Sequence, residues 1–190
     1  MQRTHRRSED RAWRPRRGGP RPTAIELAAL DQQPDGELVA VRGTIVCDVP
    51  LSGLLVQAQG VYRRLQLGQG DSWIHEAAVD FALEDDRRRR VLVLAAGARW
   101  ITPERELVRY PAARFAADHI PPQLRALVGR RPSIDAFEKV LRAGVTVEVS
   151  GRKTARPDAG GDAGGYREPP QRAALASGAD LPLVIEEVRT

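Results

Sequence analysis

The stretch FALEDDRRRRVLVLAAG, residues Phe81–Gly97, decides the fold. Apolar and other side chains alternate up to Glu84, two acids and four arginines follow, and the run VLVL is then apolar at successive positions. This pattern predicts a one-sided strand, a charged turn and a covered strand, which together form a β-hairpin. The four arginines also raise the alternative of a clamp for a polyanion. Because Asp85 and Asp86 stand directly before them, we interpret them as a turn whose charges partly neutralise one another and block edge pairing.

Further strand patterns lie on both sides of the hairpin. On the N-terminal side, residues 37–47 place Val39, Val41, Ile45 and Cys47 on one face. Residues 61–67 carry Leu65 and Leu67 on one side and Tyr62 on the other, and residues 73–85 alternate as one strand that enters the hairpin. On the C-terminal side, two more strands are predicted at residues 145–151 and 181–188.

Three short helices are expected between these strands. The first begins near Thr23, which is a candidate N-cap with Glu26 reaching back to it. The second runs from Pro122 to Gly129. The third covers residues 133–144, with Ser133 as its cap and an apolar stripe of Ile134, Phe137, Val140 and Leu141.

Together these elements predict a mainly β protein, a small antiparallel barrel of the oligonucleotide/oligosaccharide-binding (OB) type with two or three short helices. We expect one domain over residues 23–190, with a flexible loop at 155–165 because ARPDAGGDAGG is rich in glycine. Residues 1–22 mix arginine, proline and glycine and are predicted to form a disordered arm.

The charge of the chain is concentrated in that arm. Residues 1–23 hold eight arginines against Glu9 and Asp10, a net charge of +6, which leaves −1 of the total +5 for residues 24–190. Cys47 is the only cysteine, so the sequence excludes an intrachain disulfide and a cysteine-based zinc site. No apolar run is long enough for a membrane helix, and no apolar region follows the N-terminal arginines as in a signal peptide. A soluble cytoplasmic protein without membrane insertion is the expectation.

Several segments, taken in order, resemble the GIDE domain family. They are VRGTIV before PLSG, then VYRRLQL, FALEDDRRRRVLVLAAGA, VLRAGVTVEVSGR, and YREPPQRAAL before LPLVIEE. This family is a β-rich domain that lies beside the transmembrane helices of a mitochondrial ubiquitin ligase and occurs in many bacterial proteins. The resemblance covers roughly residues 36–187 and implies an OB-like interaction module. Neither the zinc-binding RING module of the ligases nor flanking membrane helices are visible here, and the resemblance supplies no catalytic residues.

No set of residues has the spacing of a catalytic motif. His75 and Glu76 do not belong to an HExxH zinc motif, because Val79 stands where the second histidine would be. We interpret His75 as a histidine packed at the rim of the barrel. Asp80, Glu84, Asp85 and Asp86 are candidates for acid/base work, but their place on a solvent face and at a turn favours simple solvation. We therefore predict no enzyme activity, no metal site and no cofactor.

The leading hypothesis is a non-catalytic interaction or scaffolding module for an unknown protein partner. The alternative is weak, salt-dependent binding of nucleic acid through the arm, whose arginines would release counterions from a polyanion. Its candidate residues are Arg14, Arg16 and Arg17, together with Tyr62, Arg63 and Arg64, where Tyr62 would stack on a base.

Overall fold

The computed structural model describes residues 3–4, 22–68, 73–101, 108–116, 118, 120–129, 131–157 and 171–188. Contacts between residues gather in two compact units, whereas the sequence predicts one domain over residues 23–190. We call the first the barrel unit; it consists of Pro20–Val49, Val79–Thr102 and Ala143–Thr190. The second is the inserted unit, which consists of Met1–Gly19, Pro50–Ala78 and Pro103–Arg142.

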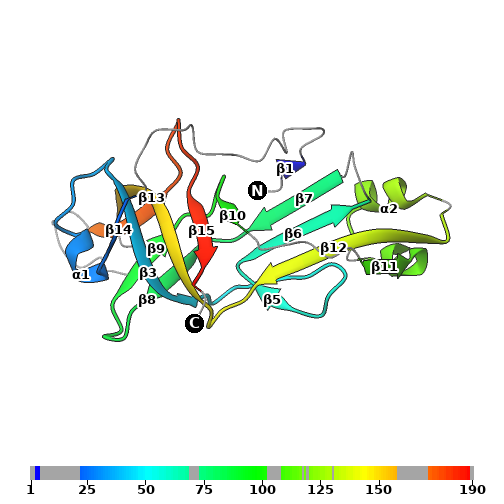
Figure 1. The fold of residues 1–190 in the computed structure, drawn as a ribbon, viewed down its shortest axis with the longest axis horizontal. Helices are drawn as coiled ribbons and strands as arrows, with labels where there is room; N and C mark the ends of the chain where they lie inside the picture. Colours follow the sequence, from blue (N-terminus) through cyan, green and yellow to red (C-terminus); the bar gives the residue numbers. More distant parts are fainter. Residues whose placement is uncertain are drawn as a thin grey trace. The chain divides into compact units, whose positions relative to one another are not determined.

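The barrel unit closes a ring of five strands (Figure 1). Strand β3 (Leu38–Val46) pairs with β8 (Phe81–Glu84), which pairs with β9 (Arg90–Val93). Strand β9 pairs with β14 (Gln171–Ala176), and β14 pairs with the long β13 (Thr146–Pro157), which returns to β3. Only the β9–β14 pairing of this ring is parallel. The predicted mainly β fold with a small OB-like barrel is therefore confirmed.

Short elements complete the barrel unit. Strand β2 (Ala24–Ile25) pairs with β3, and β15 (Val184–Glu187) lies between β13 and β10 (Arg99–Ile101). Helix α1 covers only Leu27–Leu30 and starts after Glu26, without a side-chain cap. The cap predicted at Thr23 is wrong, because residues 24–25 form a strand instead of a helical turn.

Alternation of side chains explains the barrel. Phe81 lies opposite Val93 in the hairpin, Leu83 lies opposite Val91, and all four are buried. Strand β3 buries Val39, Val41 and Ile45 in the same way, as its sequence pattern predicts. At Gly43 a Cβ atom would stand 3.1 Å from the backbone oxygen of Glu84, so the close approach of β3 and β8 favours glycine there.

The long strand predicted over residues 73–85 is wrong. It is two strands, β7 (Trp73–Ala78) in the inserted unit and β8 in the barrel unit, with a break at Val79 and Asp80. The alternation of apolar residues continues through the break, so the pattern alone does not reveal it. The Asp80 carboxylate accepts the backbone N–H of Ala95 at 2.9 Å, a bond that helps to hold the chain at this point.

Besides the N-terminal segment that holds β1, the inserted unit is built from two stretches of chain, one between β3 and β8 and one between β10 and β13. Its sheet has the order β1-β7-β6-β12-β11 (Figure 1), with β1 (Arg3–Thr4), β6 (Tyr62–Leu67), β12 (Ser133–Leu141) and β11 (Val108–Pro111). Strands β4 (Leu51–Ser52) and β5 (Gln59–Gly60) form a separate small hairpin. The short helices η1 (Ala112–Ala116) and α2 (Pro122–Val128) contribute to its core. That core consists of Leu54, Leu55, Leu65, Leu67, Phe115, Ile120, Leu124, Val128, Ile134 and Ala136.

The helix predicted over residues 133–144 is also wrong, because this segment is β12. It pairs with β6 on one side and β11 on the other, and it buries Ile134, Ala136 and Glu138 alternately. A buried glutamate at an inward position hides this alternation, so the apolar residues alone fit a helical period. By contrast, α2 begins at Pro122 and is closed by Gly129, as predicted.

Some predictions fall partly or wholly outside the described residues. Within the predicted arm, Arg3–Thr4 pairs with β7, which differs from a wholly disordered segment. Residues 1–2 and 5–21 lie outside the description. Of the predicted loop at 155–165, residues 155–157 belong to β13 and the rest lies outside the described residues.

Candidate functional site

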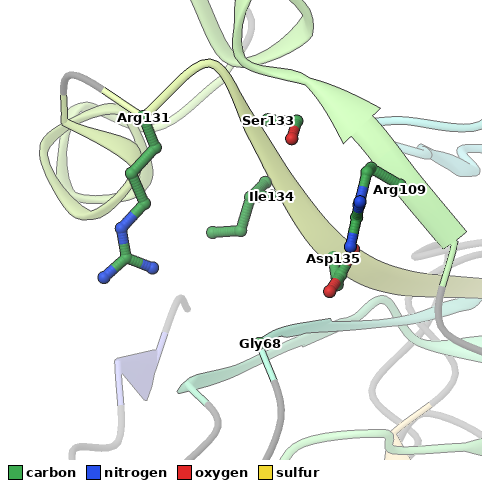
Figure 2. Close-up of a pocket in the computed structure, with 6 residues that line it drawn as sticks. All are labelled: Gly68, Arg109, Arg131, Ser133, Ile134 and Asp135. Atoms are coloured by element: carbon green, nitrogen blue, oxygen red, sulfur yellow. The ribbon is translucent and has the colours of Figure 1, made fainter.

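A hollow of about 360 Å³ opens on the inserted unit, where the ends of β6, β11 and β12 come together (Figure 2). Strand pairing creates it: Arg109 of β11 lies opposite Asp135 of β12 in register, and β12 begins directly after Arg131. The residues that line it are Gly68, Arg109, Arg131, Ser133, Ile134 and Asp135.

One wall of the hollow is an ion pair. The Arg109 Nε donates to Asp135 Oδ1 at 2.9 Å. This hydrogen bond from Arg109 lowers the pKa of Asp135, and the same bond raises the pKa of Arg109. Asp135 therefore stays ionised at neutral pH, and the pair sets the direction of the Arg109 side chain. Among the described residues, none binds the two terminal amino groups of Arg109.

Arg131 forms the opposite wall. Figure 2 shows its guanidinium on the other side of the hollow from the Arg109–Asp135 pair, with the Ile134 side chain between them. Within the part of the chain that the structure describes, no hydrogen bond or ion pair engages the Arg131 guanidinium. Two arginines against one aspartate give the hollow a net charge of +1. Ile134, which is 7% exposed, supplies an apolar floor.

This arrangement fits an anion with an apolar stem. A guanidinium presents donors in a planar fork that matches a carboxylate or phosphate bidentately. The apolar floor can contact carbon atoms next to the charged group, and the Ser133 hydroxyl is a further donor or acceptor. The geometry therefore indicates binding of an acidic group.

A second polar cluster is buried on the inward face of the same sheet. The Glu138 carboxylate accepts three successive backbone N–H groups, from Leu54 and Leu55 at 2.6 Å and from Val56 at 2.7 Å. At Gly53 a Cβ atom would stand only 2.4 Å from the Val56 oxygen. The loop between β4 and β5 thus wraps around the carboxylate as an anion nest that the protein fills with its own glutamate.

Arg63 and His75 lie on this face beside Glu138. In register, Leu65 lies opposite Glu138 on one side and opposite His75 on the other. The Arg63 Nη1 donates to the backbone oxygen of Ser52 at 2.6 Å. Burial lowers the pKa of Arg63, and the negative charge of Glu138 partly offsets this.

His75 is 3% exposed and its ring stacks on that of Trp73, with centroids 5.6 Å apart. Burial and then the charge of Arg63 lower its pKa, so the ring is neutral at pH 7. It is packed in the inserted sheet, in a different unit from the barrel rim that the sequence suggests. We interpret Glu138, Arg63 and His75 as a structural cluster that holds the β4–β5 loop.

Of the residues predicted to contact nucleic acid, the structure describes Tyr62, Arg63 and Arg64, which belong to β6 of the inserted unit. Tyr62 is 2% exposed and Arg63 is buried, so the structure offers no accessible ring for stacking at Tyr62. The Arg64 Nη1 donates to Glu76 at 3.1 Å across the β6–β7 pairing. Arg14, Arg16 and Arg17 lie outside the described residues.

The arginine run at the hairpin tip is engaged by its neighbours. Arg88 and Arg90 both donate to Glu84, at 2.8 and 2.7 Å, and their hydrogen bonds, Arg90's first, lower the pKa of Glu84. Asp85 accepts the backbone N–H groups of Arg87 and Arg89, each at 2.9 Å, and the Arg89 Nε at 2.7 Å. Partial desolvation raises the pKa of Asp85, but these bonds outweigh it and the pKa is lowered. The prediction of a turn with internal charge neutralisation is confirmed.

Three of the four acidic candidates for proton transfer have structural partners, since Asp80, Glu84 and Asp85 each bind a backbone amide or an arginine. In the described ranges, no group of three or more His, Cys, Asp or Glu side chains is placed to hold a metal ion. Likewise, no described helix is both long and apolar enough to cross a membrane. Cys47 is partly exposed.

Sequence reasoning missed Arg109, Arg131 and Glu138. The two arginines stand in a region that the prolines mark only as short helices and turns, and β11 was not predicted there. Two signals could have indicated them: the dipeptide RP directly before β12 for Arg131, and the single acid at an inward position of β12 for Glu138.

Comparisons with known proteins assign no family. No protein-family model matches the chain, and no match was found among curated proteins or among solved structures. The resemblance to the GIDE domain therefore stays a prediction.

Proposed function

We propose that this chain is a non-catalytic interaction module of the GIDE-like type, which acts in the cytoplasm by binding a protein partner. The observation that carries the proposal is the hollow on the inserted unit, where an accessible guanidinium stands beside an apolar floor, in a chain that also forms an OB-like barrel unit. OB barrels serve widely as binding scaffolds, although fold alone supports function only by analogy.

The hydrogen bonds that the acidic side chains make within the chain agree with this proposal. Asp80 holds a backbone amide where β7 and β8 separate, and Glu84 and Asp85 hold the hairpin turn. These carboxylates therefore have structural roles. The donors of the hollow, in contrast, are engaged by no described residue and are open to a partner.

The alternative function is weak nucleic-acid binding through Arg14, Arg16 and Arg17. The observation that favours it is the +6 charge of residues 1–23. Such binding would depend steeply on salt and little on sequence.

The test has two arms that use the full chain. In the first, proteins from the source cells are captured on the immobilised chain, and each candidate is then purified and titrated against it at physiological salt. We expect one partner to bind saturably in this purified system. In the second, labelled dT20 is titrated at several salt concentrations against the wild type and against Arg14, Arg16 and Arg17→Ser.

The two functions predict opposite outcomes. If the alternative is right, dT20 binds, and the triple variant reduces the slope of log K against log salt by about 2, at roughly 0.7 per lost phosphate contact. The interaction-module proposal is contradicted if no purified protein binds while dT20 binds tightly at physiological salt.

A further inference from the structure

We propose that the hollow binds the carboxylate of a glutamate or aspartate side chain from an acidic peptide segment of the protein partner. This inference rests on the proposed function and names the chemistry of the partner at the same site. It starts from the donors that the fold leaves available there: the Arg131 guanidinium, the terminal amino groups of Arg109 and the Ser133 hydroxyl, none of which is engaged by a described residue.

The positions of these donors are set by separate elements. Arg109 is held by its bond to Asp135 across the β11–β12 pairing, and Arg131 follows helix α2. Figure 2 shows Ile134 projecting between the two arginines. An acidic side chain entering here lays its methylene groups against Ile134 and brings its carboxylate to a guanidinium, a charge-assisted and geometrically specific contact.

The charge balance favours a single carboxylate over a nucleic acid. Asp135 is a fixed negative charge in the wall, so the hollow offers a net charge of +1. One carboxylate matches that charge, whereas successive phosphates of a nucleic acid would meet the aspartate. The lining residues also include no aromatic ring on which a base could stack.

The experiment is an NMR titration of the ¹⁵N-labelled full chain. The probe is a hexaglutamate peptide with blocked ends, and the matched peptide is hexaglutamine. We expect hexaglutamate to shift the amide signals of Ser133, Ile134 and Asp135 and the Nε–H signal of Arg131 saturably. Hexaglutamine should leave these signals unchanged.

Two variants with the same change of charge separate local contact from general attraction. Arg131→Gln removes the free guanidinium of the hollow and should weaken hexaglutamate binding about tenfold or more. Arg125→Gln removes an exposed arginine of α2 that does not line the hollow, and should change the affinity by less than about twofold.

Three outcomes overturn the inference. The first is an absence of saturable shifts with hexaglutamate in the wild type. The second is an equal loss of affinity in Arg131→Gln and Arg125→Gln. The third is that dT20 shifts the same signals and displaces hexaglutamate, which would make the hollow a phosphate site of a nucleic acid. If hexaglutamate fails while a purified protein still binds the chain, only this inference falls and the proposed function stands.

Discussion

Glu138 is a charged side chain at an inward position of a central strand, and three short hydrogen bonds explain why it is tolerated there. A carboxylate offers acceptors on both oxygens, so it can satisfy the N–H groups of Leu54, Leu55 and Val56 together. A buried charge with this many charge-assisted bonds costs much less than an unpaired one.

Replacing it tests that account. Glu138→Gln keeps the size but turns one acceptor into an NH₂ group that faces N–H donors, and we expect a loss of roughly 3 kcal/mol in the free energy of unfolding. Urea denaturation followed by circular dichroism measures it. Glu76→Gln, on a more exposed carboxylate of the same sheet, is the matched control and should cost no more than about 1 kcal/mol. Equal losses of unfolding free energy in the two variants would show that the nest stabilises the fold no more than an exposed ion pair does.

His75 makes a prediction about pH. Its folded-state pKa lies below that of the unfolded chain, so below about pH 6.5 the unfolded state binds the proton more readily than the folded state. Stability is therefore fully present above that pH and is lost as the pH falls. His75→Phe keeps an aromatic ring beside Trp73 and removes the titrating group, so it should flatten the dependence between pH 7.5 and 5.

The measurement is the denaturation midpoint of both proteins across that range. Carboxylates with a lowered pKa titrate mainly below about pH 5 in both proteins. The difference between the two curves therefore reports the titration of His75. If the midpoints of wild type and His75→Phe change with pH in parallel, the folded-state pKa of His75 is not lowered and the prediction is contradicted.

At the scale of elements, the hairpin of β8 and β9 shows how far a sequence pattern reaches. Its two strands, its charged turn and the burial of Phe81 and Leu83 all follow from local alternation and are confirmed. β12 shows the limit, because its inward Glu138 is explained only by a loop some eighty positions away in the chain. The hollow could not be predicted for the same reason: Arg109 and Asp135 meet only through a strand pairing that no local pattern reveals.

The hairpin tip carries its own prediction. Because Glu84 and Asp85 already engage Arg88, Arg89 and Arg90, replacing Arg87 to Arg90 with serine should leave the salt dependence of dT20 binding unchanged. Four lost phosphate contacts would instead reduce the slope of log K against log salt by about 3. A decrease of that size would restore the interpretation of the run as a polyanion clamp. Thermal unfolding of the variant verifies that the fold survives the change.

At the scale of the whole molecule, the strand patterns of the sequence do not reveal that segments between the barrel strands form a second unit. The strand patterns predict the β class and the barrel, but Pro50–Ala78 and Pro103–Arg142 form a unit of their own by pairing β6 with β12 across a long stretch of chain. The apolar alternation of the sequence continues through the break between β7 and β8, so it does not mark the boundary between the units. Only pairing between distant segments decides that the chain forms two compact units.

A core substitution in one unit should destabilise that unit and leave the stability of the other unchanged. Leu124 of α2 and Leu83 of β8 are both 0% exposed, and each Leu→Ala change should cost about 2–5 kcal/mol where it is made. Since contacts gather within each unit, Leu124→Ala should speed amide exchange in β6 and β12 while β8 and β9 keep their protection, and Leu83→Ala should do the reverse. Hydrogen exchange of the full chain, read by NMR for each strand, distinguishes the cases. If either variant accelerates exchange equally in all four strands, the chain unfolds as the one cooperative domain that its sequence predicts, because coupling between the units would then exceed the cost of either substitution.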